Sequence, residues 1–284
     1  MNSLLLAIGL GLAWMLLGAC ENEKLLDPHP CEFPLELDEY TLVWSDEFDG
    51  AEINLDNWDF EIGDGCDRDL CGWGNNELQY YTDRAENATV KDGRLIITAK
   101  KESPALEGYN YSSARMISKN KQDFRFGRID IRGKLPKGQG IWPAIWMLPT
   151  ENKFGIWPKS GEIDIMELIG NKPNEVFSTV HYGHDFWRFK SLPKYTLETG
   201  DFSLEDHTFT VLWRENCIRF MVDGELIEGA ITPSTTLPTT YPFNEVFHLI
   251  LNIAVGGNLP GDPDGSTLFP QTMEIDYIRA YEEL

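Results

Sequence analysis

The stretch GEIDIMEL, residues 161–168, holds three carboxylates interleaved with apolar side chains. Alternating polar and apolar residues are typical of a β-strand with one face in a core. Glu162 and Asp164 then point outward, but strict alternation sends Glu167 inward, where an unpaired carboxylate is costly. The sequence therefore leaves two structures: a buried Glu167, or a β-bulge at Ile165–Met166 that returns Glu167 to the outer face.

Short alternating segments of this kind recur along the chain and predict about ten strands. The pairs Asp92-Gly93 and Asp223-Gly224 stand between apolar runs and predict tight hairpin turns. Long helical periodicity is absent from the sequence. We therefore expect an all-β fold, a jelly-roll β-sandwich of two antiparallel sheets with a concave substrate cleft, and a closed barrel is the alternative. The expected strands are 94–101, 112–119, 126–135, 141–148, 162–168, 176–183, 207–215, 217–227, 247–255 and 273–281.

The N-terminal residues 1–19 are largely apolar and carry no charged side chain. This is typical of a secretory signal, and the ending LGAC resembles the lipobox of bacterial lipoproteins, in which the cysteine, here Cys20, becomes lipid-modified. The usual Lys or Arg before the apolar region is missing, and the alternative is a membrane-anchoring helix. We expect an exported chain with an acidic tether over residues 20–39 and a single domain over residues 40–284.

The composition narrows the class of partner. The net charge is −22 and the pI is about 4.5, which argues against nucleic acid because nucleic-acid binding needs a basic face. The chain also contains nine Trp and ten Tyr. Flat aromatic faces suit the apolar faces of sugar rings. A neutral substrate therefore fits the composition best.

Four cysteines follow Cys20 in the sequence. An even number in an exported chain permits disulfides, and four cysteines allow three pairings. Cys66 and Cys71 lie in the turn-rich stretch GCDRDLCGWG, which favours a local bridge, and this would leave Cys31 with Cys217. The alternative is that some of the four are free, buried thiols.

Three acids on one strand face have a chemical consequence. Crowded carboxylates repel one another, so at least one should keep its proton above its ordinary pKa. A protonated acid beside an ionised one is what glycoside hydrolysis requires. The alternatives are a solvated acidic strand face or a metal site.

Three motifs in order resemble those of one enzyme family. EIDIME matches the ExDxxE signature of glycoside hydrolase family 16, and two further stretches resemble its laminarinase-like members, the endo-β-1,3-glucanases. These stretches are GNNELQYYT (74–82) and IWPAIWMLP (141–149). The likeness runs from WSDEFDG (44–50) to DYIRAY (276–281), which is nearly the whole predicted domain.

The resemblance implies a retaining endo-hydrolase on a concanavalin-like jelly roll. Glu162 would be the nucleophile and Glu167 the general acid/base, with Asp164 between them helping to set their protonation. Met166 would be the extra residue that laminarinase-like members have and the mixed-linkage lichenase group lacks. The implied chemistry needs no cofactor.

Several other residues are candidate sugar ligands. Trp142 and Trp146 share a strand face and would stack on glucose rings, although core packing is the competing interpretation. Trp157 precedes the carboxylate strand, and Arg115 and His181 lie on strands that could border the cleft. In GNNELQYYT, the side chains of Asn75 and Glu77 suit sugar hydroxyls, and a capped turn is the alternative.

A structural calcium site away from the cleft also follows from the resemblance. It would use Glu47, the Gly93 carbonyl and Asp276, because oxygen ligands of this kind suit Ca²⁺. Without the resemblance these would be ordinary surface acids.

We therefore expect a monomeric endo-β-1,3-glucanase acting on laminarin-type glucans, with possible activity on mixed-linkage β-1,3-1,4-glucan. The alternatives are a non-catalytic β-glucan-binding surface lipoprotein, or a family relative acting on agar-type galactans. Non-catalytic relatives lose one or both motif glutamates, whereas Glu162 and Glu167 are both present here.

Overall fold

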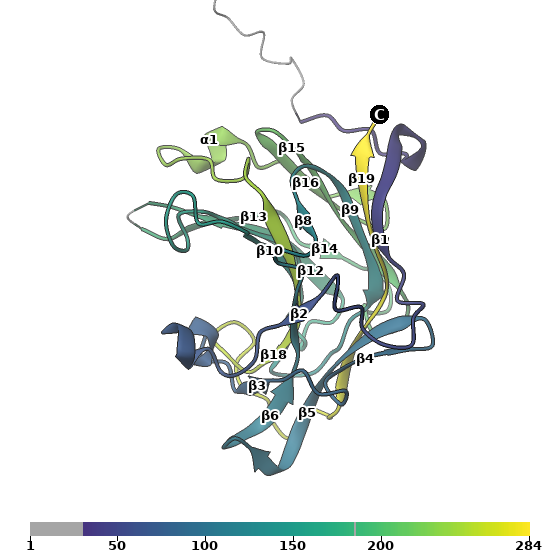
Figure 1. Ribbon diagram of the computed structural model, residues 1–284, viewed down its shortest axis with the longest axis vertical. Coiled ribbons are helices and arrows are strands. Elements are labelled where there is room, and N and C mark those ends of the chain that lie inside the picture. The colour runs from purple at the N-terminus through teal and green to yellow at the C-terminus, as the bar shows by residue number, and fades with distance from the viewer. Residues whose placement is uncertain (1–30, 185) are drawn as a thin grey trace, which may run out of the picture.

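The computed structural model describes residues 31–184 and 186–284. The predicted signal and Cys20 lie outside the described residues. Within the described part, two stacked β-sheets make up nearly the whole fold (Figure 1). None of its helices has the length and apolar character needed to cross a membrane.

The first sheet has ten strands among the described residues and is antiparallel except for one parallel pair, β3 with β6. Strands β1 and β4 pair with β19 and β5, respectively. The other strands follow one another across the sheet in the order β17 (Glu225–Leu226), β16 (Cys217–Val222), β15 (His207–Arg214), β9 (Gly127–Lys134), β19 (Gln271–Glu283), β5 (Arg94–Leu106), β6 (Tyr109–Ser113) and β3 (Gln79–Tyr81), with β1 at Tyr40–Asp46 and β4 at Ala88–Lys91.

The second sheet carries the carboxylate strand and, within residues 31–184 and 186–284, has nine antiparallel strands. Its order is β13 (Arg188–Ser191), β12 (Glu175–Tyr182), β11 (Glu162–Glu167), β10 (Ile141–Pro149), β18 (Phe247–Val255), β7 (Arg115–Ile117) and β2 (Asp59–Phe60), with β14 (Tyr195–Thr196) on β12 and β8 (Asp123–Phe124) on β18. The helical segments are short: η1 (Leu37–Glu39), η2 (Cys66–Arg68), η3 (Cys71–Gly74) and α1 (Pro233–Thr236).

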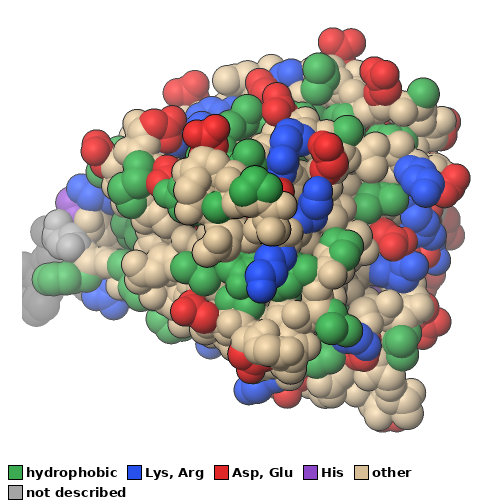
Figure 2. Space-filling view, turned by 90° about the horizontal axis from the view of Figure 1, so that it is seen from below, with side chains coloured by type: hydrophobic (Ala, Val, Ile, Leu, Met, Phe, Trp, Pro, Cys, Tyr) green, Lys and Arg blue, Asp and Glu red, His purple; other side chains and the backbone are tan. Residues whose placement is uncertain are grey.

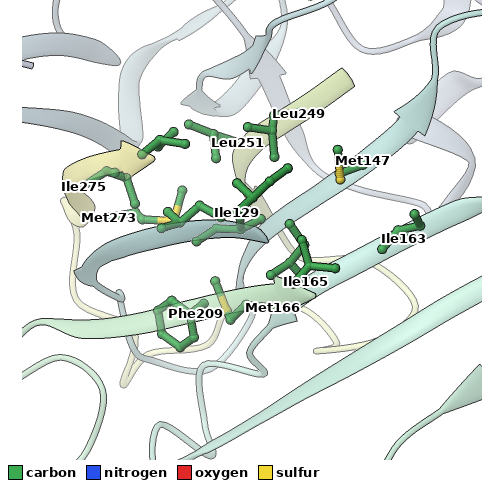
Figure 3. Close-up of a cluster of buried hydrophobic side chains, with 14 of the residues drawn as sticks. Ile129, Met147, Ile163, Ile165, Met166, Phe209, Leu249, Leu251, Met273 and Ile275 are labelled. Atoms are coloured by element: carbon green, nitrogen blue, oxygen red, sulfur yellow. The ribbon is translucent and has the colours of Figure 1, made fainter. Parts of the chain in front are cut away.

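The hydrophobic core lies between the two sheets, where alternate side chains of each strand meet (Figure 3). The second sheet contributes Met147, Ile163, Ile165, Met166, Leu249 and Leu251, and the first contributes Ile129, Phe209, Met273 and Ile275. The opposite face of the second sheet is left for polar and aromatic side chains. We call this face the catalytic face.

The predicted β-sandwich is confirmed, and the barrel is not what forms. Both predicted turns are two-residue hairpins with positive φ, which Asp-Gly pairs adopt readily. We expected the segment 112–119 to form one strand, but it is divided at Ala114. Its first residues end β6 in the first sheet and its next residues form β7 in the second, so the chain passes from one layer to the other there.

Two disulfides are present, Cys66–Cys71 and Cys31–Cys217. The second fastens residues 31–39, which we expected to be part of a loose tether, to strand β16. Arg214 donates to the Glu32 carbonyl at 2.7 Å, and its guanidinium lies 4.6 Å from the Phe33 ring centroid. The described part of this segment is therefore bound to the domain surface.

Acidic and basic side chains are interspersed on the face of the molecule seen in Figure 2. Among the described residues, many of the basic groups are paired with acids: Lys134 lies 3.1 Å from Glu274, and Arg94 lies 2.7 Å from Asp206. The acidic surplus of −22 remains after such pairs are counted.

Candidate active site

Strand β11 contains the predicted bulge. Asp164 and Glu167 are both in register with neighbouring strands, while one extra residue is accommodated between them, at Ile165–Met166. The Ser178 hydroxyl donates to the Ile165 carbonyl at 2.7 Å, so the irregular backbone has a partner. Ile165 and Met166 both enter the core (Figure 3). The bulge hypothesis is confirmed, and Glu167 lies on the catalytic face with Asp164.

Two indole N–H groups hold the outer carboxylates. The Trp157 Nε1 donates to Glu162 Oε2 at 2.7 Å, and the Trp142 Nε1 donates to Glu167 Oε1 at 3.0 Å. Although both acids are on the catalytic face, neighbouring side chains cover them, and Glu167 is only 8% exposed. Trp142 and Trp157, which we predicted as stacking platforms, thus also contact the acids directly.

The central acid contacts a histidine. His181 lies opposite Glu162 on β12, and its Nε2 is 3.1 Å from Asp164 Oδ2 and 3.6 Å from Glu162 Oε1. The Trp187 Nε1 donates to His181 Nδ1 at 2.9 Å. Because Nδ1 accepts that bond, the neutral imidazole carries its proton on Nε2, which is the ring nitrogen near the two carboxylates. Trp187 was not predicted from the sequence.

The environment raises the pKa of all three carboxyls. Burial is the largest cause for Glu162, whose pKa rises to about 8, and repulsion from Asp164 adds to it. Burial also raises the pKa of Asp164. The pKa of Glu167 lies well above its ordinary value because of burial first and the Asp164 charge second. The cluster therefore retains protons at neutral pH, as the crowding of three acids led us to expect.

A buried polar network continues from β10 across β18. The Trp146 Nε1 donates to Asn252 Oδ1 at 2.7 Å, Asn252 Nδ2 donates to the Tyr81 hydroxyl at 3.0 Å, and that hydroxyl lies 3.3 Å from Glu77 Oε2. Asn75 also donates to Glu77, at 3.2 Å. Burial raises the pKa of Glu77. The carboxyl of Glu77 therefore lies at the buried end of this network, whereas Asn75 is half-buried at its edge.

Arg115 is held between two indole rings. Its guanidinium carbon lies 4.4 Å from the Trp73 ring centroid and 4.7 Å from that of Trp146. Its Nε donates to Glu61 Oε2 at 2.5 Å. Trp73 belongs to η3, directly after the Cys66–Cys71 disulfide. The disulfide loop thus helps to fix an arginine on the catalytic face.

The sequence-predicted sugar ligands are brought together. His181, Trp146 and Arg115 lie on strands β12, β10 and β7 of one sheet, and Trp157 and Trp142 hold the acids of β11 between them. Four strand spacings of about 4.8 Å separate β12 from β7, so the row spans roughly 19 Å. The loop with Asn75 and Glu77 joins this face through a bridge from Glu77 to Gly256.

Sequence reasoning missed five residues that complete this face. Asn252 carried a signal, since it is a polar residue inside the apolar run FHLILNIAV. Tyr81 lies in the quoted motif GNNELQYYT, although it was not singled out. The other three come from loops or distant strands, and nothing local in the sequence marks them. The five are Glu61, Trp73, Tyr81, Trp187 and Asn252.

The predicted calcium ligands are not free oxygens in the structure. Both Glu47 oxygens accept from Arg279, at 2.9 and 2.8 Å, and Asp276 pairs with Arg132. Gly93 lies in the β4–β5 turn. The residues as folded therefore do not form a ready site, and Ca²⁺ would have to displace two arginines.

Among the described residues, one group of side chains has metal-like spacing: Glu162, Asp164 and His181, whose ligand atoms lie within 4.8 Å of one another. Hydrogen bonds from Trp157 and Trp187 orient Glu162 and His181, respectively.

An open sheet face with clustered acids of raised pKa, flanked by indoles and amides, defines a glycoside hydrolase that cleaves a polysaccharide. Comparison with known proteins gives the family. The Glycosyl hydrolases family 16 model matches residues 75–279, and the chain belongs to this family.

Similar proteins share both sequence and fold. The chain is 42% identical over 259 residues to a beta-glucanase of Rhodothermus marinus, covering 85% of each protein. It is 39% identical to glucan endo-1,3-beta-glucosidase A1 of Niallia circulans, covering 85% of this chain but only 38% of that longer protein. The laminarinase catalytic domain of Thermotoga maritima is 43% identical with a TM-score of 0.80, covering 87% of this chain and 99% of that domain.

Proposed function

We propose that the protein is an endo-β-1,3-glucanase that hydrolyses internal bonds of laminarin-type glucans with retention of anomeric configuration. The observation that carries this proposal is the bulge in β11, because it sets Glu162, Asp164 and Glu167 on one face. The names of the similar proteins, two of them endo-1,3-glucanases or laminarinases, support the substrate.

In the first step, a carboxylate oxygen of Glu162 attacks the anomeric carbon of the bound sugar. The bond from that carbon to the glycosidic oxygen breaks, and Glu167 gives its proton to the departing oxygen. The raised pKa of Glu167 suits this role, since the acid must still hold its proton at working pH. The Trp157 N–H stabilises the Glu162 anion that must form before attack.

In the second step, Glu167 is ionised and takes a proton from a water molecule. The water oxygen attacks the anomeric carbon, and the ester bond to Glu162 breaks. Asp164 and His181 tune the two glutamates electrostatically, because His181 Nε2 lies 3.1 Å from Asp164 Oδ2 and 3.6 Å from Glu162 Oε1. Trp142, Trp146, Arg115 and Asn75 orient the sugar rings.

The test is reducing-sugar release by the protein from laminarin, lichenan and agarose, with Glu162→Ser as the matched control. We expect release from laminarin that is lost in the variant, with weaker release from lichenan. Proton NMR of the first product should show the β-anomer. Laminarin binding without release from any polymer would contradict the proposal and identify a binding protein, and release from agarose alone would identify a galactanase.

We also propose that the protein is exported, lipid-anchored at Cys20 and monomeric. Its two disulfides support export, since such bonds persist in oxidising compartments. The Cys31–Cys217 bond would fix where an anchored N-terminal segment leaves the domain. Replacing Cys20 by Ala should move the protein from the membrane fraction to the soluble fraction, and light scattering of the soluble form should give the mass of one chain.

A further inference from the structure

Aromatic side chains continue beyond the acids toward the edge of the catalytic sheet. Glu162 on β11 is in register with His181 on β12, which is in register with Phe189 on β13. Directly paired residues of antiparallel strands lie on the same face, so Phe189 lies on the catalytic face. The row crosses two strand spacings and extends about 10 Å past Glu162.

The rings in this row contact one another. Trp187 stacks on His181 with ring centroids 5.7 Å apart and planes within 7°, and it stacks on Phe189 at 5.3 Å. Trp157 lies 6.2 Å from Trp187. We call Trp187 and Phe189 the outer platform. It joins the candidate active site without a break, because Trp187 also donates its N–H to His181.

The two rings of the outer platform are exposed to solvent at the edge of the sheet, where large apolar side chains are unusual. Trp187 is 54% and Phe189 is 56% exposed, although both are packed against other rings. Strand β13 ends the strand order of its sheet, and edge strands usually avoid exposed apolar residues because these invite association. Adjacent exposed aromatic side chains indicate a binding surface.

The surrounding groups define the kind of ligand. In the neighbouring row, the hydroxyls of Thr179 and Ser191 lie 2.9 Å apart on the same strands. Arg188 and Lys190 alternate with Phe189 and so point to the opposite face. Flat rings beside hydroxyls, with the strand's cations turned away, suit a neutral polyhydroxylated ligand.

We propose that the outer platform binds sugar residues of the glucan chain that extend past the bond cleaved at Glu162. This inference rests on the proposed function and gives it a chain-length dependence. A short oligosaccharide seated at Glu162 does not reach β13, whereas a polymer does. Affinity should therefore increase with chain length until the platform is filled.

The test compares Phe189→Ala with Phe186→Ala. Phe186 is a matched control because it lies on the same hairpin and is 78% exposed, yet it takes part in no ring contact of the platform. KM is measured on laminarin and on β-1,3-linked oligosaccharides of increasing length. We expect Phe189→Ala to raise the KM for laminarin about 2- to 10-fold, with a smaller ratio for shorter substrates. The variant Phe189→Trp, which restores a flat ring, should recover the wild-type KM.

The outcomes separate this inference from the proposed function. If the wild type releases no sugar from any β-1,3-glucan, the proposed function fails. If the wild type is active but Phe189→Ala and Phe186→Ala show the same KM at every chain length, the outer platform alone is refuted. A wild-type dimer that Phe189→Ala makes monomeric would also overturn it, because the edge strand would then bind a second copy.

Discussion

Replacing Glu162 by Gln should stabilise the fold at neutral pH while abolishing activity. Burial raises the pKa of Glu162 from 4.5 to about 8, so the folded protein holds this proton more tightly than the unfolded chain. Stability from a raised carboxyl pKa is fully present below pH 4.5 and is lost as pH rises toward 8. Glutamine has nearly the same shape, cannot ionise, and can still accept the Trp157 hydrogen bond.

The size of the effect follows from the shift. Each pH unit between the two pKa values lowers the free energy of unfolding by about 1.4 kcal/mol. For this carboxyl the loss is roughly 1 kcal/mol at pH 5, about 3 kcal/mol at pH 7, and on the order of 5 kcal/mol well above pH 8. The side chain is only 15% exposed, so solvent screening reduces the loss little.

Urea unfolding at pH 5 and pH 7 measures the effect. The stability of Glu162→Gln relative to the wild type should increase by about 2 kcal/mol between these pH values. Glu86→Gln, at an exposed position, should show no such change. A difference that is independent of pH, or a variant less stable than the wild type at pH 7, would refute the reasoning, because the carboxyl would then cost the fold nothing when ionised.

Three further predictions follow from the same site and its surroundings. Asp164→Asn removes a charge that raises the pKa of Glu167, so the alkaline limb of kcat/KM against pH should move to lower pH, and an unmoved limb would contradict the coupling. Trp187→Phe keeps a ring but removes the N–H that fixes His181, so kcat should fall about 2- to 10-fold with little change in KM; a change in KM alone would argue against this role. Calcium binding at Glu47 and Asp276 requires Ca²⁺ to displace Arg279 and Arg132; if it does, Tm should be higher in Ca²⁺ than in EDTA and Glu47→Gln should abolish the difference, whereas equal Tm values would exclude the site.

The central strand could be predicted in detail because two local rules conflicted. Alternation placed the isoleucines inside, and the cost of burying a carboxylate then left either a buried Glu167 or an extra residue before it. The conflict lies within six residues, so the sequence located it, and the register of the neighbouring strands shows that the bulge is the structure that forms. Strand β18, a long apolar run, also begins and ends where the sequence indicated, at Phe247–Val255.

What could not be predicted depends on contacts far apart in the chain. The division of segment 112–119 at Ala114 is invisible in a pattern that reads as one strand, because the change of sheet depends on which strands lie nearby. Arg115 is fixed by Glu61 and Trp73, which both precede it by many residues in the sequence. The disulfide loop and several strands lie between Glu61 and Arg115 along the chain. A sequence marks a charged residue on a strand, but it does not show what holds that residue in place.

The bulge also explains why this site is stable enough to hold three acids. An extra residue could have been accommodated by looping outward, but here Ile165 and Met166 enter the core one after the other and leave the acids on the catalytic face. Ile165 and Met166 are 3% and 1% exposed, so both side chains of the bulge contribute hydrophobic burial to the fold directly beneath the carboxyls. Deleting Met166 would remove part of that burial and would also turn Glu167 inward, since a one-residue shift exchanges the faces of a strand. Stability and catalysis at β11 thus depend on the same residue, although it touches no substrate.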